Sequence, residues 1–98
     1  MRVVFRPEAR LEVLEAKAWY EARVPGLGME FARALEVAVH SANRSPEAFS
    51  VIKDDCRRVL MRRFPYSVIY RSRQGELLVV AVFHHRREPD SWRGRSGR

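Results

Sequence analysis

The sequence predicts a single α+β domain in the order β-α-α-β-β-β, with an antiparallel helix hairpin packed on one face of a mainly antiparallel four-stranded sheet. Two observations predict this class. Apolar residues of the first half recur at helical spacing on both sides of a Pro-Gly turn, whereas the second half holds short runs rich in Val, Ile, Phe and Tyr. A length of 98 residues fits one domain, which we expect to span 1–93, with 94–98 as a disordered basic tail.

A short strand is expected first, over Arg2–Phe5, and a helix directly after it. Pro7 suits the first position of a helix, and helical periodicity continues to about Arg23. The apolar stripe of this helix is expected to comprise Leu11, Leu14, Ala18 and Ala22.

The breaker residues 25–28, Pro-Gly-Leu-Gly, end the first helix in a tight turn. A second helix is expected from about Met29 to Arg44. So short a connection between two helices indicates an antiparallel hairpin. The apolar stripe of the second helix is expected to comprise Phe31, Leu35, Ala38 and Ala42.

Three strands are expected in the second half, over Arg57–Phe64, Tyr66–Arg73 and Glu76–His84. The breakers at 64–65 and 74–75 separate them and predict an antiparallel meander. Residues 77–83 are apolar without interruption, which is typical of an interior strand. We therefore expect the N-terminal strand to pair beside this last strand.

Strand alternation sorts the side chains of the meander between the two faces of the sheet. If the helices cover Val68 and Tyr70, then Ser67, Arg71 and Arg73 point away from them. On the preceding strand, one face is shared by Arg58, Leu60 and Arg62. The open face of the sheet is thus expected to be basic.

The charge of the chain is concentrated in its second half. The formal net charge is +7, yet residues 1–49 hold seven basic and seven acidic side chains, whereas residues 50–98 hold twelve basic and five acidic ones. The excess predicts a polyanionic or acidic partner for the second half.

Several classes of protein and site are excluded. No run approaches the ~18 apolar residues that span a bilayer, and the N-terminus lacks the apolar stretch of a signal peptide. The lone Cys56 rules out a disulfide framework, fits a reducing cytoplasm, and is expected to pack inertly. No cofactor or metal is expected, because His84 and His85 are adjacent on a strand end and point to opposite faces, and His40 is expected to be solvated.

The most distinctive local feature is the strand end at 83–92, which carries His84, His85, Arg86 and Arg87 and is followed by Trp92. Histidine beside arginine suits general acid–base cleavage of a phosphodiester. The same residues suit an electrostatic clamp on nucleic acid or on an acidic protein segment. They are equally typical of a solvated basic strand end, so residue chemistry leaves all three open.

Six strings occur in a recognisable order: Trp19-Tyr20-Glu21, Pro25-Gly26-Leu27-Gly28 with Glu30-Phe31, Ser45-Pro46-Glu47 with Phe49, Arg57-Arg58-Val59-Leu60, Phe64-Pro65-Tyr66-Ser67-Val68-Ile69-Tyr70-Arg71, and Val82-Phe83-His84-His85-Arg86-Arg87. Together they resemble the RelE/ParE toxin superfamily, and more narrowly its ParE-like plasmid stabilization branch, over about residues 1–93. The resemblance implies the toxin of a bacterial type II toxin–antitoxin pair, cytoplasmic and neutralised by an antitoxin whose segment, often acidic, wraps the helices and sheet. The expected contact lies around Glu15–Arg33 and on the basic sheet face.

The superfamily divides by mechanism. RelE-like members cut messenger RNA on the ribosome, whereas ParE-like members lack that residue set and bind DNA gyrase. Arg58 and Arg86 match basic positions of RelE-like members, but Leu60 and Ser67 stand where those proteins carry basic residues. Trp92 stands near their terminal tyrosine and has no hydroxyl for proton transfer. The resemblance therefore favours a ParE-like toxin that binds its target, with gyrase as a plausible one, over an enzyme.

The residues expected to bind partners are Arg58, Arg62, Arg71, Arg73, Arg86, Arg87 and Trp92. The first alternative is a metal-independent, ribosome-dependent messenger-RNA endonuclease, with a site formed by His84, His85, Arg86, Arg58 and Arg62. The second is a weakly toxic relic that only binds its antitoxin. None of these requires a membrane or sequence-specific DNA binding by the toxin alone.

Overall fold

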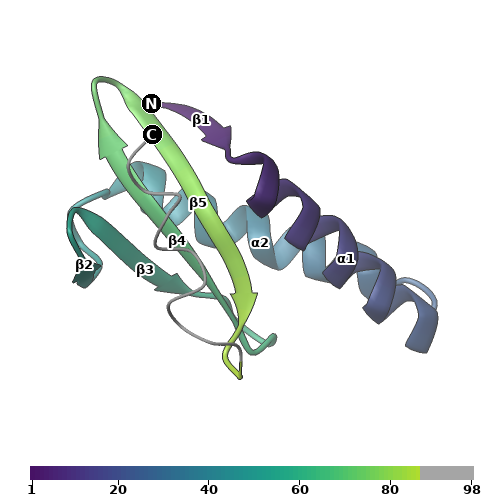
Figure 1. The fold of residues 1–98 in the computed structure, drawn as a ribbon. Helices are drawn as coiled ribbons and strands as arrows, with labels where there is room; N and C mark the ends of the chain where they lie inside the picture. Colours follow the sequence, from purple (N-terminus) through teal and green to yellow (C-terminus); the bar gives the residue numbers. More distant parts are fainter. Residues whose placement is uncertain (87–98) are drawn as a thin grey trace.

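A computed structural model describes residues 1–86, so the end of the expected domain, the expected tail at 94–98, Arg87 and Trp92 lie outside the described residues. The elements, in chain order, are β1 (Arg2–Phe5), α1 (Pro7–Arg23), α2 (Leu27–Arg44), β2 (Val51–Lys53), β3 (Cys56–Leu60), β4 (Tyr66–Arg73) and β5 (Glu76–His84) (Figure 1). The α+β class, the helix hairpin and the order of the expected elements are confirmed. Within residues 1–86, no helix has the length and apolar character needed to cross a bilayer.

The sheet has five strands in the order β1-β5-β4-β3-β2, so the expected number of four is wrong. β1 pairs in parallel with β5, as expected of its position beside the last strand, and the other pairs are antiparallel. The additional strand, Val51–Lys53, is three residues long and exposed throughout. It therefore shows no alternation of buried and exposed residues from which a strand could be predicted. β3 ends at Leu60 and not at Phe64, because the chain turns at Arg63, whose φ is 72°.

Only one of the two helices, α2, buries the face that its apolar residues predict. The α2 stripe of Phe31, Leu35, Ala38 and Ala42 is confirmed as buried. The predicted α1 stripe is wrong, since Leu11 is 55% and Leu14 is 56% exposed, and Ala18 and Ala22 are exposed as well. The buried residues of α1 are Ala9, Glu12 and Ala16.

Small side chains explain the choice of face on α1. Ala9 and Ala16 let the helix backbone approach its neighbours closely, and Glu12 lies between them on the same face. The Glu12 carboxylate Oε1 accepts a hydrogen bond of 2.9 Å from the backbone N–H of Val82 in β5. The acid thus ties the helix to the edge of β5.

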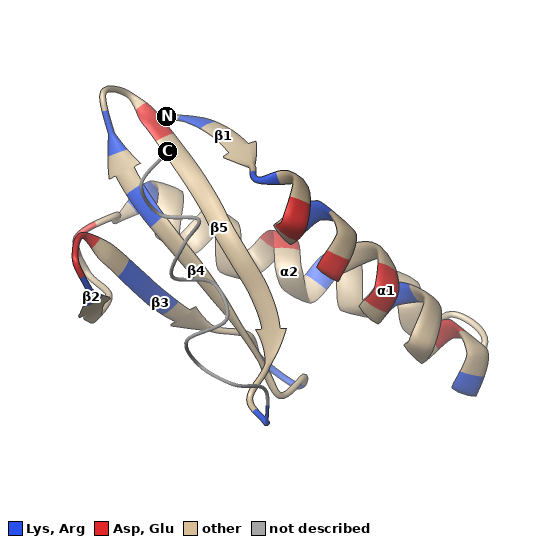
Figure 2. Cartoon of the chain, viewed as in Figure 1, with Lys and Arg blue, Asp and Glu red and all other residues tan. Residues whose placement is uncertain are grey.

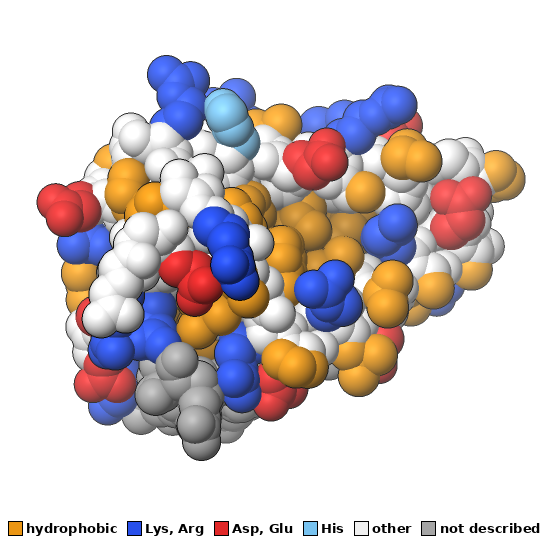
Figure 3. All heavy atoms as spheres, turned by 90° about the horizontal axis from the view of Figure 1, so that it is seen from above, with side chains coloured by type: hydrophobic (Ala, Val, Ile, Leu, Met, Phe, Trp, Pro, Cys, Tyr) orange, Lys and Arg blue, Asp and Glu red, His pale blue; other side chains and the backbone are white. Residues whose placement is uncertain are grey.

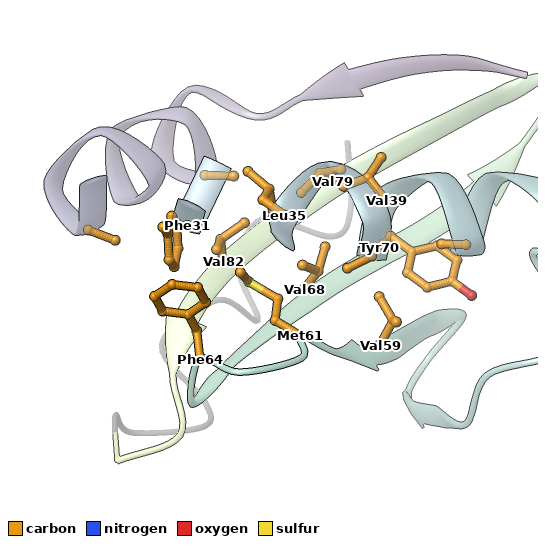
Figure 4. Close-up of a cluster of buried hydrophobic side chains, with 14 of the residues drawn as sticks. Phe31, Leu35, Val39, Val59, Met61, Phe64, Val68, Tyr70, Val79 and Val82 are labelled. Atoms are coloured by element: carbon orange, nitrogen blue, oxygen red, sulfur yellow. The ribbon is translucent and has the colours of Figure 1, made fainter. Parts of the chain in front are cut away.

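The main core lies between the helices and the sheet (Figure 4). Phe31 and Leu35 of α2 pack towards Val68 of β4 and Val82 of β5. Aromatic rings close one end of this core, with the Phe31 and Phe64 ring centroids 5.3 Å apart in an edge-on arrangement. Burial of these large side chains stabilises the fold by roughly 1.5–3 kcal/mol each.

A second apolar cluster lies on the sheet face opposite the helices, which we call the far face. It comprises Cys56, Ile69, Leu78, Val80, Ala81 and Phe83, with Val4 packed against it. β5 is therefore buried on both faces, as predicted for an interior strand. Cys56, the single cysteine of the chain, is buried within this cluster, as expected for packing.

The hairpin depends on a close approach between the two helices. Gly28 sits so near α1 that a Cβ built there would lie 2.8 Å from the backbone oxygen of Lys17. In the same place, the Glu21 carboxylate accepts hydrogen bonds from the backbone N–H groups of Gly26 (2.9 Å) and Gly28 (3.0 Å). Glu21 thereby satisfies free N–H groups at the start of α2 from the end of α1.

Replacing Gly28 with alanine is expected to destabilise the fold. The new Cβ forces the helix backbones apart, and this overpacking exceeds the gain in helix propensity, for a net loss of about 1–2 kcal/mol. Urea denaturation followed by circular dichroism measures it. Met29→Ala, at the exposed neighbouring position, is the control and is expected to change stability by less than about 0.5 kcal/mol. Equal stability of Gly28→Ala and the wild type would contradict the close approach.

The Glu21 contact is expected to make stability depend on pH. Its hydrogen bonds from Gly26, and then Gly28, lower the pKa of Glu21 below its ordinary value. A lowered pKa in the folded state contributes stability above the unfolded pKa, and this contribution disappears as the pH falls through the folded pKa. Glu21→Gln should therefore be less stable than the wild type at neutral pH, with the difference shrinking in acid. Urea midpoints across that pH range test this, and a difference independent of pH would refute it.

Candidate functional site

Charge is distributed unevenly over the elements. Acidic residues are interspersed with basic ones along α1, whereas the charged residues of β3 and β4 are all arginines (Figure 2). Some arginines are already paired, since Arg73 contacts Asp55 at 2.8 Å and Arg63 contacts Glu30 at 2.6 Å. The expected partner-binding residues therefore differ in whether their charge is paired, and among those within residues 1–86 an ion pair partly neutralises Arg73.

Two of the expected arginines on the far face, Arg58 and Arg71, differ in their exposure. Arg58 stands opposite Ile69 in the β3–β4 register and is exposed. Arg71 stands opposite Leu78 in the β4–β5 register and is only 5% exposed. The predicted orientation of Arg71 away from the helices fits these neighbours, but the face around it is largely apolar and buried.

Arg62 lies on the other side of the sheet, in a hollow between α2 and β3 that we call the α2 groove. Its volume is about 670 Å³, and its wall includes the exposed apolar side chains of Val37 and Leu60. Arg33, Arg62 and Arg63 also line it, against the single acid Glu30. The groove therefore combines an apolar wall with a net positive charge.

His84 lines a third place, a cavity of about 310 Å³ between α1 and the end of β5 that we call the α1 cavity. Its ring packs edge-on against Tyr66, with centroids 5.2 Å apart, and its Nδ1 accepts a hydrogen bond of 3.1 Å from the backbone N–H of Arg86. Because Nδ1 accepts this hydrogen bond, Nε2 is the nitrogen that bears the proton when the His84 ring is neutral. The other lining residues are Glu12, Glu15, Ala16, Trp19, Tyr20, Val82 and Phe83.

His85 and Arg86 follow β5 in an exposed turn. The backbone N–H of His85 donates a hydrogen bond of 2.9 Å to the carbonyl of Pro65, which holds this turn against the β3–β4 connection. The side chain of His84 faces the α1 cavity, which has acids rather than arginines in its wall. The two histidines thus offer no shared site.

The residues of the endonuclease alternative are divided among these places. His84 lines the α1 cavity, Arg62 lines the α2 groove, and Arg58 stands on the far face. General acid–base cleavage needs a proton-transfer group within reach of the groups that hold the phosphate. Among residues 1–86, no three His, Cys, Asp or Glu side chains are grouped to hold a metal ion.

Sequence reasoning missed three features of these surfaces. Glu12 is a buried acid, and the small-residue spacing of Ala9 and Ala16 around it is the signal that could have revealed its face. Arg57 is turned to the helix side, where its Nη1 donates to the carbonyl of Phe49 at 2.7 Å. Tyr70 donates its hydroxyl to the carbonyl of Pro46 at 2.9 Å, and burial raises the pKa of Tyr70 while the charge of Arg57 partly opposes that rise.

Comparison with known proteins identifies the family of this fold. A family profile described as the ParE toxin of the type II toxin–antitoxin system parDE matches residues 3–89. A solved chain from a chromosomal ParDE toxin–antitoxin system of P. aeruginosa superposes with a TM-score of 0.75 at 12% sequence identity, covering 86% of this chain and 95% of that one. No curated protein matches the sequence. The profile match spans nearly the whole chain, and the protein belongs to the ParE toxin family of type II toxin–antitoxin systems.

Proposed function

We propose that this protein is a growth-inhibiting toxin that acts in the cytoplasm by binding a cellular target, DNA gyrase, and that a cognate antitoxin neutralises it. Membership of the ParE toxin family supports the toxin role. A mechanism by binding rather than by catalysis is supported by one observation, which is that His84, Arg62 and Arg58 lie on three different surfaces. A nuclease would need these groups around one phosphate.

The surface around the hairpin supports contact with an antitoxin. Large apolar side chains reach solvent at Trp19, Val24 and Met29, all within the expected contact region of residues 15–33. Apolar side chains also reach the surface over the two-helix arm, between charged ones (Figure 3). The guanidinium of Arg23 lies 3.6 Å from the centroid of the Trp19 ring, so charge and apolar area occur together. Such a surface suits an acidic, amphipathic segment.

The α2 groove extends this surface on the other side of α2. Its apolar wall and its arginines, Arg33 and Arg62, are complementary to a segment that alternates apolar and acidic side chains. The expected partner-binding set thus divides into groove residues and far-face residues. Arg87 and Trp92, outside the described residues, remain part of the proposal on sequence grounds alone.

Expression of the full chain alone is expected to stop growth, and co-expression of the small protein encoded beside it is expected to restore growth. The purified chain should inhibit gyrase supercoiling and leave messenger RNA intact in a translating ribosome extract.

Normal growth with abundant folded protein would contradict toxicity and favour the weakly toxic relic. Cut messenger RNA with unaffected supercoiling would favour the endonuclease, and His84→Ala and His85→Ala, made separately, would then identify its histidine.

The hairpin contact is expected to depend on Trp19. A charge at this position, in Trp19→Asp, removes an exposed aromatic anchor and should weaken antitoxin binding by about 2 kcal/mol or more, since such anchors dominate interface energies. Titration calorimetry with the co-encoded antitoxin measures the affinity, and circular dichroism checks the fold. Val51→Asp places the same charge at an exposed position on β2 and should bind normally. Equal weakening by both variants would count against the hairpin as the contact.

A further inference from the structure

The first helix carries an apolar stripe on its outer side, which we call the α1 stripe. Leu11 is 55% and Leu14 is 56% exposed, and Ala18 and Ala22 on the same side are exposed as well. The opposite side of α1 is the one that packs against α2 and β5. Single exposed leucines are ordinary, but apolar residues that recur along one side of a helix form a continuous contact surface. The fold therefore uses one of two contact surfaces of α1.

The spacing of the α1 stripe is that of a helix that packs on another helix. Leu11, Leu14 and Ala18 are separated by three and then four positions, as are the a, d and a positions of a heptad. Glu21 takes the next d position, and its carboxylate is bound at the start of α2. The apolar contact therefore ends at Ala18 and extends over about 12 Å of helix.

The charges beside the α1 stripe differ in sign between its two edges. With both leucines of the stripe at positions a and d, Arg10 takes position g and Glu15 takes position e. Lys17 extends the basic edge and Glu8 extends the acidic edge, so charges of both signs lie along α1 (Figure 2). Arg10 and Glu15 are exposed, and within residues 1–86 neither forms an ion pair. Both charges are thus available to a partner.

These edges select the orientation in which two α1 helices can pair. In an antiparallel pair around a two-fold axis, each edge meets its own copy, so glutamate would face glutamate. In a parallel pair, the g edge of each helix meets the e edge of the other. Arg10 of each copy then faces Glu15 of the other, and the two-fold axis forms this contact twice. Parallel pairing therefore makes the apolar stripe and its charged edges complementary at the same time.

We propose that the α1 stripe is a self-association surface, through which two copies of this chain form a parallel, two-fold symmetric dimer with Leu11, Leu14 and Ala18 at its centre. This inference goes beyond the proposed function and does not depend on it. A contact along so short a piece of helix lies at the low end of interface sizes. The dimer is accordingly weak, with a Kd of about 100 µM.

A second copy fits the α1 stripe better than a lipid surface or an antitoxin segment. Interfacial helices carry basic residues along their polar face, whereas Glu8 and Glu15 would be repelled by anionic lipids. An acidic antitoxin segment would suit the basic edge and meet repulsion at the acidic one. Both leucines also precede the contact region at residues 15–33 that the resemblance implies. A copy of α1 supplies both signs of charge where they are needed.

Sedimentation equilibrium of the purified full-length chain, between about 10 µM and 1 mM, measures self-association. The wild type is expected to change from monomer to dimer over this range. Leu11→Ser/Leu14→Ser removes the apolar contact at exposed positions and should stay monomeric, with an unchanged circular dichroism spectrum and Tm. Val51→Ser/Ile52→Ser makes the same change at exposed positions of β2 and should dimerise as the wild type does.

Charge reversal tests the parallel register. Arg10→Glu and Glu15→Arg each place like charges across the contact and should raise the Kd about tenfold. The double variant Arg10→Glu/Glu15→Arg exchanges the two edges and should dimerise as the wild type does. An equimolar mixture of the two single variants should form heterodimers in preference to either homodimer. Lys53→Glu, at an exposed position of β2, changes the net charge as Arg10→Glu does and should leave the Kd unchanged.

A wild type that stays monomeric at every concentration would overturn the proposal. So would a dimer that Leu11→Ser/Leu14→Ser leaves intact, because its interface would lie elsewhere. Single charge reversals without effect would contradict the parallel pairing. A monomeric chain in which the serine variant loses affinity for the co-encoded antitoxin would assign the stripe to the antitoxin instead. None of these measurements reads growth or supercoiling, so the dimer and the proposed toxicity can fail independently.

Discussion

The burial of β5 on both faces is the constraint on which the rest of the structure depends. A strand whose side chains are apolar on both sides needs a covering layer above and below, and neighbours at both edges. The helix hairpin covers one face, the far-face cluster forms on the other, and β1 and β4 pair along its edges. The position of α1 follows from its packing against β5, and the position of β1 follows from its pairing with the same strand. The α1 cavity lies between α1 and the end of β5.

Much of the fold was predictable because its strongest patterns are local. The α2 stripe and the uninterrupted apolar run of β5 both identify their elements and their buried sides. On α1, by contrast, the large apolar residues Leu11 and Leu14 face solvent, while Ala9 and Ala16 are buried. Periodicity identifies the most apolar face of a helix, but on α1 the close packing against the sheet and α2 requires the face with small side chains. β2 escaped prediction because three exposed residues carry no pattern.

The candidate site was less predictable than the fold. The concentration of basic residues in the second half is visible in the sequence, and so is the orientation of Arg71 away from the helices. The division of Arg58, Arg62 and His84 among separate surfaces is not, since it depends on which edge of the sheet α1 and α2 cover. Burial of Arg71 is likewise a property of packing, and strand alternation cannot reveal it.

The parallel pairing of β1 with β5 also governs when the molecule can form. Arg2 lies beside Glu76, and Phe5 beside Val79. β1 is therefore synthesised well before β5 and can join the sheet only after β5 has been made. Contacts so distant along the chain carry a loop-closure cost and slow folding. Until β5 has left the ribosome, the growing chain lacks the central strand of the sheet, and the helix hairpin lacks the strand that it covers. A nascent chain of this design therefore stays incomplete until β5 has been synthesised.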